Sequence, residues 1–339
     1  MYEALPYQAV VTGVGSFVPE NVLTNADFEK MVETTDEWIV SRTGIRERHI
    51  LPKGQATSDM ALEAAKKALE VAKVDPEEIE IVVCGTFTPD YVFPSTACML
   101  QSKLGLKNAG CFDLAAACSG FVYGLTVGSQ FITTGKYKKV LVIGADANSR
   151  LVDYEDRNTC VLFGDGAGAV VLEQRPMVDD EKDRRGLLSS FLRADGNGWV
   201  NLFQPAGGSL RPPTHETIDE HLHHIKMDGK EVFKFASNAM WKASLAAIEA
   251  ANLTPDDIDL VVPHQANVRI IKNALRRIKI PNDKVIINID RYGNTVAASV
   301  GLALDEAYRE GRLADGMNVL LVAFGAGSTW GGIVIRWGC

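Results

Sequence analysis

Two segments of the chain repeat the same order of apolar and polar positions. Residues 65–83 (AKKALEVAKVDPEEIEIVV) and residues 244–262 (SLAAIEAANLTPDDIDLVV) align at a constant offset of 179 residues. Each begins with apolar residues at helical spacing, continues through an acidic turn that contains proline, and ends in a short apolar run. The pattern predicts a helix, a turn and a buried strand in both segments. A single pair of copies indicates two similar halves rather than a solenoid.

The other apolar runs extend this repeat. They lie at residues 81–84, 140–143, 260–262 and 319–323, and the second and fourth runs obey the same offset. Because uninterrupted apolar strands alternate with helices, we expect an α/β protein whose sheets are covered on both faces. We place its two pseudo-symmetric halves at residues 1–180 and 181–339. Ligands of such sheets bind beyond the carboxyl ends of the strands, so one site is expected to gather strand-end residues from both halves.

Composition narrows the class of protein. The chain has 339 residues, of which 46% are hydrophobic and 23% charged, and its net charge of −8 argues against nucleic-acid binding. Its six cysteines are too sparse for a disulfide scaffold and lack zinc-site spacing, so no metal is expected. Residues 1–6 do not resemble a signal peptide, and no apolar run approaches the roughly 18 residues of a membrane span. We therefore expect a cytoplasmic protein with no membrane partner.

Cys118 is the strongest candidate for chemistry. It lies in a run of small residues at 115–120 (AAACSG), between an apolar run at 110–114 and a helix-like stretch from Phe121. A thiol at a helix N-terminus meets unpaired N–H groups, which favour the thiolate and lower the pKa below its usual value of about 8.5. The alternative interpretation is a small buried hydrophobic residue.

Three further features fall at predicted strand ends. His264 follows the strand at 260–262, Asn294 precedes the helix whose repeat partner begins near Cys118, and residues 324–328 form a Gly-rich loop. Each has an ordinary structural explanation: a structural histidine, a helix cap and a tight turn. Together, a thiol, an imidazole, an amide and a loop with free N–H groups on one sheet edge suit acyl transfer through a covalent thioester.

Other patterns are weaker. The glycines at 13–15 and 164–168 resemble dinucleotide fingerprints but lack the strand–turn–helix context, so we reject that interpretation. The pair His215-Glu216 lacks the second histidine of a zinc protease, and a metal role for the cluster at 221–224 is disfavoured. Residues 199–230, rich in proline and glycine, are expected to form a lid, a connector or a surface loop.

The motifs together resemble the β-ketoacyl-acyl-carrier-protein synthase III family of the thiolase-like superfamily, which starts bacterial fatty acid synthesis. The resemblance runs nearly end to end and is carried by residues 36–45, 115–120, 163–168, 263–267, 293–299 and 324–331. The pairing of one histidine with one asparagine is similar to the initiating synthases and differs from the elongating synthases and thiolases. The resemblance implies a layered α-β-α-β-α fold and a homodimer.

The resemblance also implies a mechanism. Cys118 takes an acyl group from acyl-CoA, with acetyl-CoA as the expected donor. His264 and Asn294 then stabilise the enolate formed when malonyl-acyl-carrier protein loses CO₂, and this carbanion attacks the Cys118 thioester. The backbone N–H groups of Cys118 and Ala326 form an oxyanion hole. No cofactor is expected, because acyl-CoA is itself a substrate.

Further residues take binding roles by the same resemblance. The expected CoA contacts are Trp38, Arg42, Arg157, Gly229 and Asn267, with Trp38 and Arg157 around the adenine and the last two along the pantetheine. Phe93 is expected to close the acyl pocket of the partner subunit. The basic residues expected to meet the carrier protein are Lys234, Arg269, Arg276 and Arg277. Ser328 stands where some relatives carry an aromatic residue, which leaves the primer length open.

Three alternatives stay open at this point. A condensing enzyme of secondary metabolism would use the same three residues on another primer or acceptor. A nucleotide-binding module would bury Cys118 without using it. An inactive scaffold would have lost the chemistry, although the intact cysteine, histidine and asparagine weigh against it.

Overall fold

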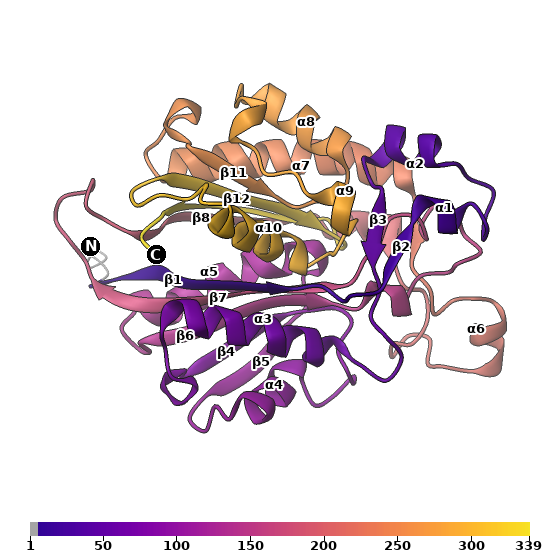
Figure 1. Ribbon diagram of the computed structural model, residues 1–339, viewed down its shortest axis with the longest axis horizontal. Helices are drawn as coiled ribbons and strands as arrows, with labels where there is room; N and C mark the ends of the chain where they lie inside the picture. The colour runs from indigo at the N-terminus through magenta and orange to yellow at the C-terminus, as the bar shows by residue number, and fades with distance from the viewer. Residues whose placement is uncertain (1–5) are drawn as a thin grey trace.

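Two β-sheets alternate with three layers of helices (Figure 1). The computed structural model describes residues 6–339. The first sheet has the strand order β1-β7-β6-β4-β5, and the second has the order β11-β12-β13-β8. The first sheet consists of β1 (Tyr7–Phe17), β7 (Gly166–Pro176), β6 (Lys139–Asp146), β4 (Ile81–Gly85) and β5 (Gly110–Leu114). The second consists of β11 (Leu260–Pro263), β12 (Asn318–Gly325), β13 (Thr329–Arg336) and β8 (Gly186–Ala194).

Helices cover both faces of each sheet. The outer face of the first sheet packs against α3 (Thr57–Ala72) and α4 (Thr96–Leu104), and that of the second against α7 (Gly229–Ala250) and α8 (Val268–Arg277). The helices α5 (Gly120–Thr133) and α10 (Ala298–Arg309) lie between the sheets, where their apolar residues join both inner faces in one buried cluster (Figure 1). The predicted α-β-α-β-α arrangement is therefore confirmed.

The sequence repeat is visible in the element boundaries. The strands β4 and β6 begin at residues 81 and 139, and their counterparts β11 and β12 begin at 260 and 318. The two acidic turns are both short 3-10 helices, at Pro76–Glu78 and Pro255–Asp257. All strands of the first sheet lie before residue 177 in the chain, and all strands of the second sheet lie after residue 185. The boundary at residue 180 stays a prediction.

Helix packing explains one of the glycine patterns. Gly13 lies within β1, and a β-carbon there would come within 2.1 Å of the carbonyl oxygen of Ala68 in α3. The buried face of α3 is itself built largely from alanine, so helix and strand approach closely. The glycine is required by packing, which agrees with rejecting a dinucleotide fingerprint at this place.

The smaller elements lie at the edge of the two sheets where the central helices begin. They are β2 (Val22–Thr24), β3 (Glu47–His49), α1 (Asn25–Phe28), α2 (Asp36–Thr43), α6 (His215–Asp219), β9 (Leu202–Phe203), β10 (Lys226–Met227) and α9 (Ile289–Tyr292). The segment predicted as an excursion at 199–230 is partly ordered by the pairing of β9 with β10. Among the helices of residues 6–339, none combines the length and apolar character that a membrane crossing requires.

Candidate active site

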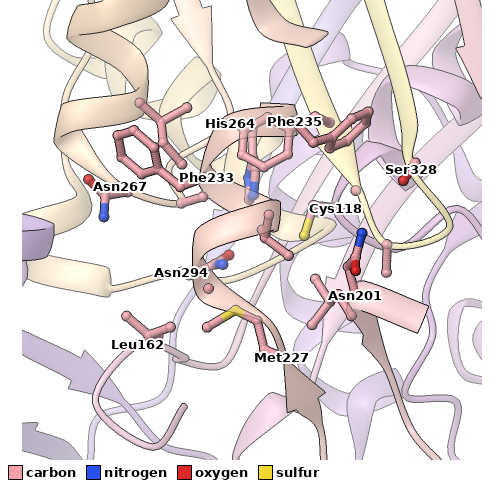
Figure 2. Close-up of a pocket in the computed structure, with 18 of the residues that line it drawn as sticks. Cys118, Leu162, Asn201, Met227, Phe233, Phe235, His264, Asn267, Asn294 and Ser328 are labelled. Carbon is pink, nitrogen blue, oxygen red and sulfur yellow. The ribbon is translucent and has the colours of Figure 1, made fainter. Parts of the chain in front are cut away.

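The strand-end features predicted from the sequence meet in one pocket. Cys118 lies in a 3-10 turn between β5 and α5, His264 directly follows β11, and Asn294 stands between α9 and α10. All three line a pocket of about 790 Å³, part of which is open to solvent (Figure 2). The predicted residues Gly229, Asn267 and Ala326 line the same pocket. This volume is in the range of pockets that bind small molecules.

The sequence did not single out much of the pocket wall. Additional lining residues include Leu162, Asn201, Met227, Phe233 and Phe235 (Figure 2). Asn201 and Met227 belong to the 199–230 segment, so this segment forms part of the site instead of a separate surface loop. Apart from Gly229, which the family resemblance implied, the only signal of this segment in the sequence was its proline and glycine content, which does not identify wall residues.

Cys118 is buried, with 5% of its surface exposed. Burial raises the pKa of its thiol well above the ordinary value, and the nearby Asp146 carboxylate raises it further. The prediction of a lowered pKa is therefore wrong. The helix start does favour negative charge on sulfur, but loss of hydration and a neighbouring carboxylate both oppose it. The thiol is neutral until a reacting group takes its proton.

Asp146 is a buried carboxylate that the sequence did not reveal. Its Oδ2 accepts a hydrogen bond from the N–H of Ala297 at 3.0 Å, and its Oδ1 accepts from the N–H of Phe87 at 2.9 Å. The hydroxyls of Thr86 and Thr88 donate to Oδ1 as well. Burial raises the Asp146 pKa, and the four hydrogen bonds lower it. Burial has the larger effect, so the pKa rises to about 6. The carboxylate ties the loop after β4 to the start of α10, beside Cys118.

His264 is fully buried and presents one nitrogen to the pocket. Its Nδ1 lies 3.0 Å from the hydroxyl of Ser299, whereas Nε2 has no hydrogen-bond partner among residues 6–339. Burial lowers the pKa of His264 to about 3, so the ring is neutral at neutral pH. A neutral imidazole with a free Nε2 suits a hydrogen-bond donor better than a general base, because so low a pKa makes a weak base.

Asn294 is fixed by its own backbone and side chain. Its N–H donates to the carbonyl of Leu162 at 2.8 Å, and its carbonyl accepts from Gly164 at 3.0 Å. The side-chain Oδ1 accepts from the N–H of Val296 at 3.0 Å. This bond occupies the oxygen, so the Nδ2 amide group is the part of the side chain left to donate to a ligand.

The loop after β12 closes against Cys118. A β-carbon at Gly325 would lie 2.9 Å from the backbone nitrogen of Cys118, so only glycine allows this approach. The N–H of the next residue, Ala326, donates no hydrogen bond to another described residue. Two backbone N–H groups beside one sulfur are the arrangement that an oxyanion hole requires.

An apolar chamber extends from Cys118. Its volume is about 420 Å³, part of which is open to solvent, and four of its residues also line the main pocket: Cys118, Phe163, Leu202 and Ala326. Its remaining lining residues are apolar except for one glutamine: Phe87, Ala117, Phe203, Gln204, Ile225 and Val296. A chamber of this kind accepts a hydrocarbon group attached to sulfur but gives little stabilisation to a charged one.

The predicted CoA contacts at the protein surface also lie together. The guanidinium groups of Arg42 and Arg157 lie 5.0 and 5.3 Å from the ring centroid of Trp38. Asn267, which lines the pocket, donates from Nδ2 to the carbonyl of Arg42 at 2.9 Å. This contact links the arginine–tryptophan group, outside the pocket, to the pocket wall.

The predicted docking residues are exposed on α7 and α8. They are Lys234, Arg269, Arg276 and Arg277. Arg269 stacks over Phe233, at 5.5 Å from the ring centroid, and Phe233 lines the pocket. Arg277 instead stacks over Trp241 at 3.6 Å and donates to Asn238. The basic face is thus continuous with the pocket through Arg269.

Phe93 lies apart from the pocket of its own chain. Its side chain is 84% exposed, and its neighbours Tyr91 and Val92 are also exposed. Phe93 does not line the acyl chamber of its own chain. An exposed position of this kind is required of a residue that closes the chamber of a partner subunit.

One group among residues 6–339 has ligand atoms close enough to hold a metal ion: Asp153, Glu155 and His221. Nδ1 of His221 lies 3.1 Å from Asp153, and the Lys226 ammonium lies 3.8 Å from the same carboxylate. A cation is already present, so ion pairing explains the group without a metal. None of the three lines the pocket.

Comparison with known proteins gives consistent matches over most of the chain. A family model for the C-terminal part of 3-oxoacyl-[acyl-carrier-protein] synthase III matches residues 248–337, and a second model for the same synthase matches residues 112–196. The β-ketoacyl-[acyl-carrier-protein] synthase III of Caldanaerobacter subterraneus is 54% identical over 97% of this chain and 98% of that protein. The synthase III of Clostridioides difficile is 51% identical over the same shares.

Solved structures agree with these matches. A crystal structure of 3-oxoacyl-[acyl-carrier-protein] synthase III from Aquifex aeolicus is 43% identical, with a TM-score of 0.88 over 97% of this chain and all of that chain. The priming β-ketosynthase of a polyketide biosynthetic pathway is 34% identical, with a TM-score of 0.90 over 99% of this chain and 98% of that one.

Proposed function

The chain belongs to the β-ketoacyl-[acyl-carrier-protein] synthase III family, the condensing enzymes that initiate fatty acid synthesis, and from this premise we propose that Cys118, His264 and Asn294 carry out the reaction. The observation that carries the proposal is the pocket itself. It holds a thiol beside one imidazole nitrogen and one amide nitrogen, neither of which is engaged by another described residue.

In the first step, Cys118 exchanges with the thioester of acyl-CoA. Sγ attacks the carbonyl carbon, the carbon–sulfur bond to CoA breaks, and the thiol proton leaves with the CoA sulfur. The start of α5 favours the negative charge that develops on Sγ during attack, although burial keeps the resting thiol neutral. The acyl chain then occupies the apolar chamber beside Cys118.

In the second step, malonyl-acyl-carrier protein enters the main pocket. The bond to its carboxylate breaks, CO₂ leaves, and the electron pair moves onto the thioester oxygen as an enolate. Nε2 of His264 and Nδ2 of Asn294 donate hydrogen bonds to this oxygen. Neutral donors in a buried site stabilise charge where it develops, and they need no reorganisation.

The enolate carbon then attacks the acyl group on Cys118. The oxyanion that forms lies between the N–H groups of Cys118 and Ala326. Collapse expels the Cys118 sulfur, which takes a proton from solvent, and 3-ketoacyl-carrier protein leaves. Burial assists this last protonation, because it favours the neutral thiol.

We assign the arginine–tryptophan group to the CoA nucleotide. The adenine would stack on Trp38, with Arg42 next to the phosphates; the Arg157 guanidinium, which lies 5.3 Å from the ring centroid, would have to move outward for the adenine to enter between them. Asn267 and Gly229 would line the path of the pantetheine to Cys118. No cofactor takes part in this scheme.

We also propose that the carrier protein docks on the basic face of α7 and α8. Reversing the charge in Arg269→Glu is expected to raise KM for malonyl-acyl-carrier protein at least tenfold, because it places like charges at the interface. The KM for acyl-CoA should change less than about twofold, since Arg269 lies outside the CoA contacts. Steady-state kinetics with each substrate varied separately would measure both values.

A matched control is Lys66→Glu, which reverses an exposed lysine on the outer helix α3. It should leave both KM values unchanged. Equal increases for both substrates in Arg269→Glu would contradict docking at this face.

The proposed assembly is a homodimer. The strand β5 lies at the edge of the first sheet, with one side unpaired by any other strand of the described chain. The exposed residues Tyr91, Val92 and Phe93 lie on the loop after β4, the strand beside it. Their exposed apolar surface supports burial against a second copy, in which Phe93 would close the partner's acyl chamber.

The decisive assay supplies acyl-CoA primers of increasing length, straight and branched, together with malonyl-carrier protein. We expect 3-ketoacyl-carrier protein, CoA and CO₂, with a preference for short primers that fit the apolar chamber. Condensation with the carrier protein of another pathway, but not with that of fatty acid synthesis, would favour the secondary-metabolism alternative. If the protein accepted acyl groups but formed no 3-ketoacyl product with any malonyl-carrier protein, the proposed reaction would be refuted.

A further inference from the structure

Ser299 lies directly behind the imidazole of His264. It is the second residue of α10, it is 1% exposed, and it does not line the pocket. Its Oγ lies 3.0 Å from Nδ1 of His264 and 2.7 Å from the backbone nitrogen of Gln265. It makes no other hydrogen bond to a described residue, so these two contacts decide where its proton points.

The contact with Gln265 is fixed in direction. A backbone N–H can only donate, so Ser299 Oγ accepts from Gln265. Gln265 is itself held in place, because its side chain donates to the carbonyls of Pro263 and Ile286 at 3.0 Å each and accepts from the N–H of Asn288 at 3.1 Å. The Ser299 hydroxyl proton then has one acceptor within reach, Nδ1 of His264.

The two neutral forms of the imidazole differ in what they leave unpaired. With the ring proton on Nε2, Nδ1 accepts from Ser299 and every hydrogen-bonding group behind the ring is paired. With the proton on Nδ1, the Ser299 hydroxyl would be a buried donor without an acceptor, which is unfavourable. The low pKa of His264, about 3, excludes the doubly protonated ring at neutral pH.

We propose that Ser299 is a positioning residue, whose hydroxyl donates to Nδ1 of His264 and thereby keeps the ring proton on Nε2, facing the pocket. This inference rests on the proposed function, in which Nε2–H donates to the enolate oxygen. A ring with its proton on Nδ1 would present a lone pair to that oxygen and repel it. Two neighbouring residues would therefore orient the two donors: Ser299, in the first turn of α10, orients the His264 ring, and Val296, two residues before the helix, leaves the Asn294 amide nitrogen free by donating to Oδ1.

The first test is spectroscopic and uses the wild-type protein. Nitrogen NMR of protein labelled with ¹⁵N-histidine distinguishes the protonated from the unprotonated ring nitrogen, and His264→Asn identifies the signals of His264 among the six histidines. We expect the proton on Nε2 with no change between pH 5 and 8. Ser299→Ala should convert this signal to a mixture of the two neutral forms. A wild-type ring with its proton on Nδ1 overturns the inference.

The second test separates the two half-reactions. Ser299→Ala should lower malonyl decarboxylation roughly 10- to 100-fold, a smaller loss than removal of a whole donor, and should leave acyl loading of Cys118 within about twofold. Ser299→Thr, which keeps a hydroxyl, should recover most of the decarboxylation. Ser244→Ala removes a fully buried hydroxyl from α7 that donates to the Met240 carbonyl, and should change neither rate.

The outcomes also distinguish a failure of the Ser299 positioning role from a failure of the proposed function on which it rests. If His264→Ala loses decarboxylation while Ser299→Ala retains it, only the role of Ser299 fails. If His264→Ala itself decarboxylates at the normal rate, the proposed function fails. Equal losses in Ser244→Ala and Ser299→Ala would show a general effect of removing buried hydroxyls and would overturn the positioning role.

Discussion

Replacing Cys118 with serine is expected to abolish transfer of acyl groups from acyl-CoA to the protein, with a loss of at least about a thousandfold. A serine hydroxyl needs a general base to attack a thioester. His264, which lines the same pocket, has a pKa of about 3 and is too weak a base for that role. Mass spectrometry of the intact protein after incubation with acyl-CoA measures the covalent adduct directly.

Cys160→Ser is the matched control for this variant. Cys160 is also buried, at 1% exposure, and belongs to the same apolar cluster as Cys118, but it does not line the pocket. The Cys160→Ser variant should form the acyl adduct on Cys118 at the wild-type rate. An adduct that persists in Cys118→Ser would exclude Cys118 as the nucleophile and would direct attention to another of the six cysteines.

The division into two similar α/β halves was predictable because the chain repeats itself, whereas the layered α-β-α-β-α order was implied by the family resemblance. A fixed offset between residues 65–83 and 244–262 predicts equivalent strands, and β4 and β11 begin at positions that obey it. Apolar patterning cannot predict how the strands order within a sheet. The antiparallel β1–β7 and β8–β13 edges depend on long-range pairing that no local pattern records.

The reacting residues were predictable from their places at element ends. Cys118 and His264 follow strands, and the rule for α/β sheets places such residues on one edge. Asn294 lies between α9 and α10 and was predicted from its place before the helix that corresponds to α5 in the repeat. Ser299 and Asp146 were missed because each acts through hydrogen bonds between residues that no local pattern connects: Ser299 with His264 within the second half, and Asp146 with Ala297 across the two halves. The predicted direction of the Cys118 pKa shift was wrong because burial and the Asp146 carboxylate, which the fold brings close to the thiol, outweigh the local helix start.

The largest effect on the second half-reaction is expected from His264→Ala and Asn294→Ala. Each should lower malonyl decarboxylation about 100- to 1,000-fold, the loss typical of removing one donor to a developing oxyanion. Acyl loading of Cys118 should continue, because the oxyanion donors proposed for it are backbone N–H groups that neither substitution removes. Release of labelled CO₂ from malonyl-carrier protein measures the first quantity, and adduct mass measures the second.

Asn294→Asp sharpens this prediction by changing the charge at nearly constant shape. A carboxylate accepts hydrogen bonds and would repel the enolate, so it should be at least as damaging as Asn294→Ala. Asn201→Ala serves as the control, because Asn201 lines the same pocket without a role in the proposed chemistry. Normal condensation by both His264→Ala and Asn294→Ala would show that these two side chains do not stabilise the enolate. Loss of acyl loading together with decarboxylation would instead mean that the two side chains support the fold of the pocket rather than the charge on the enolate.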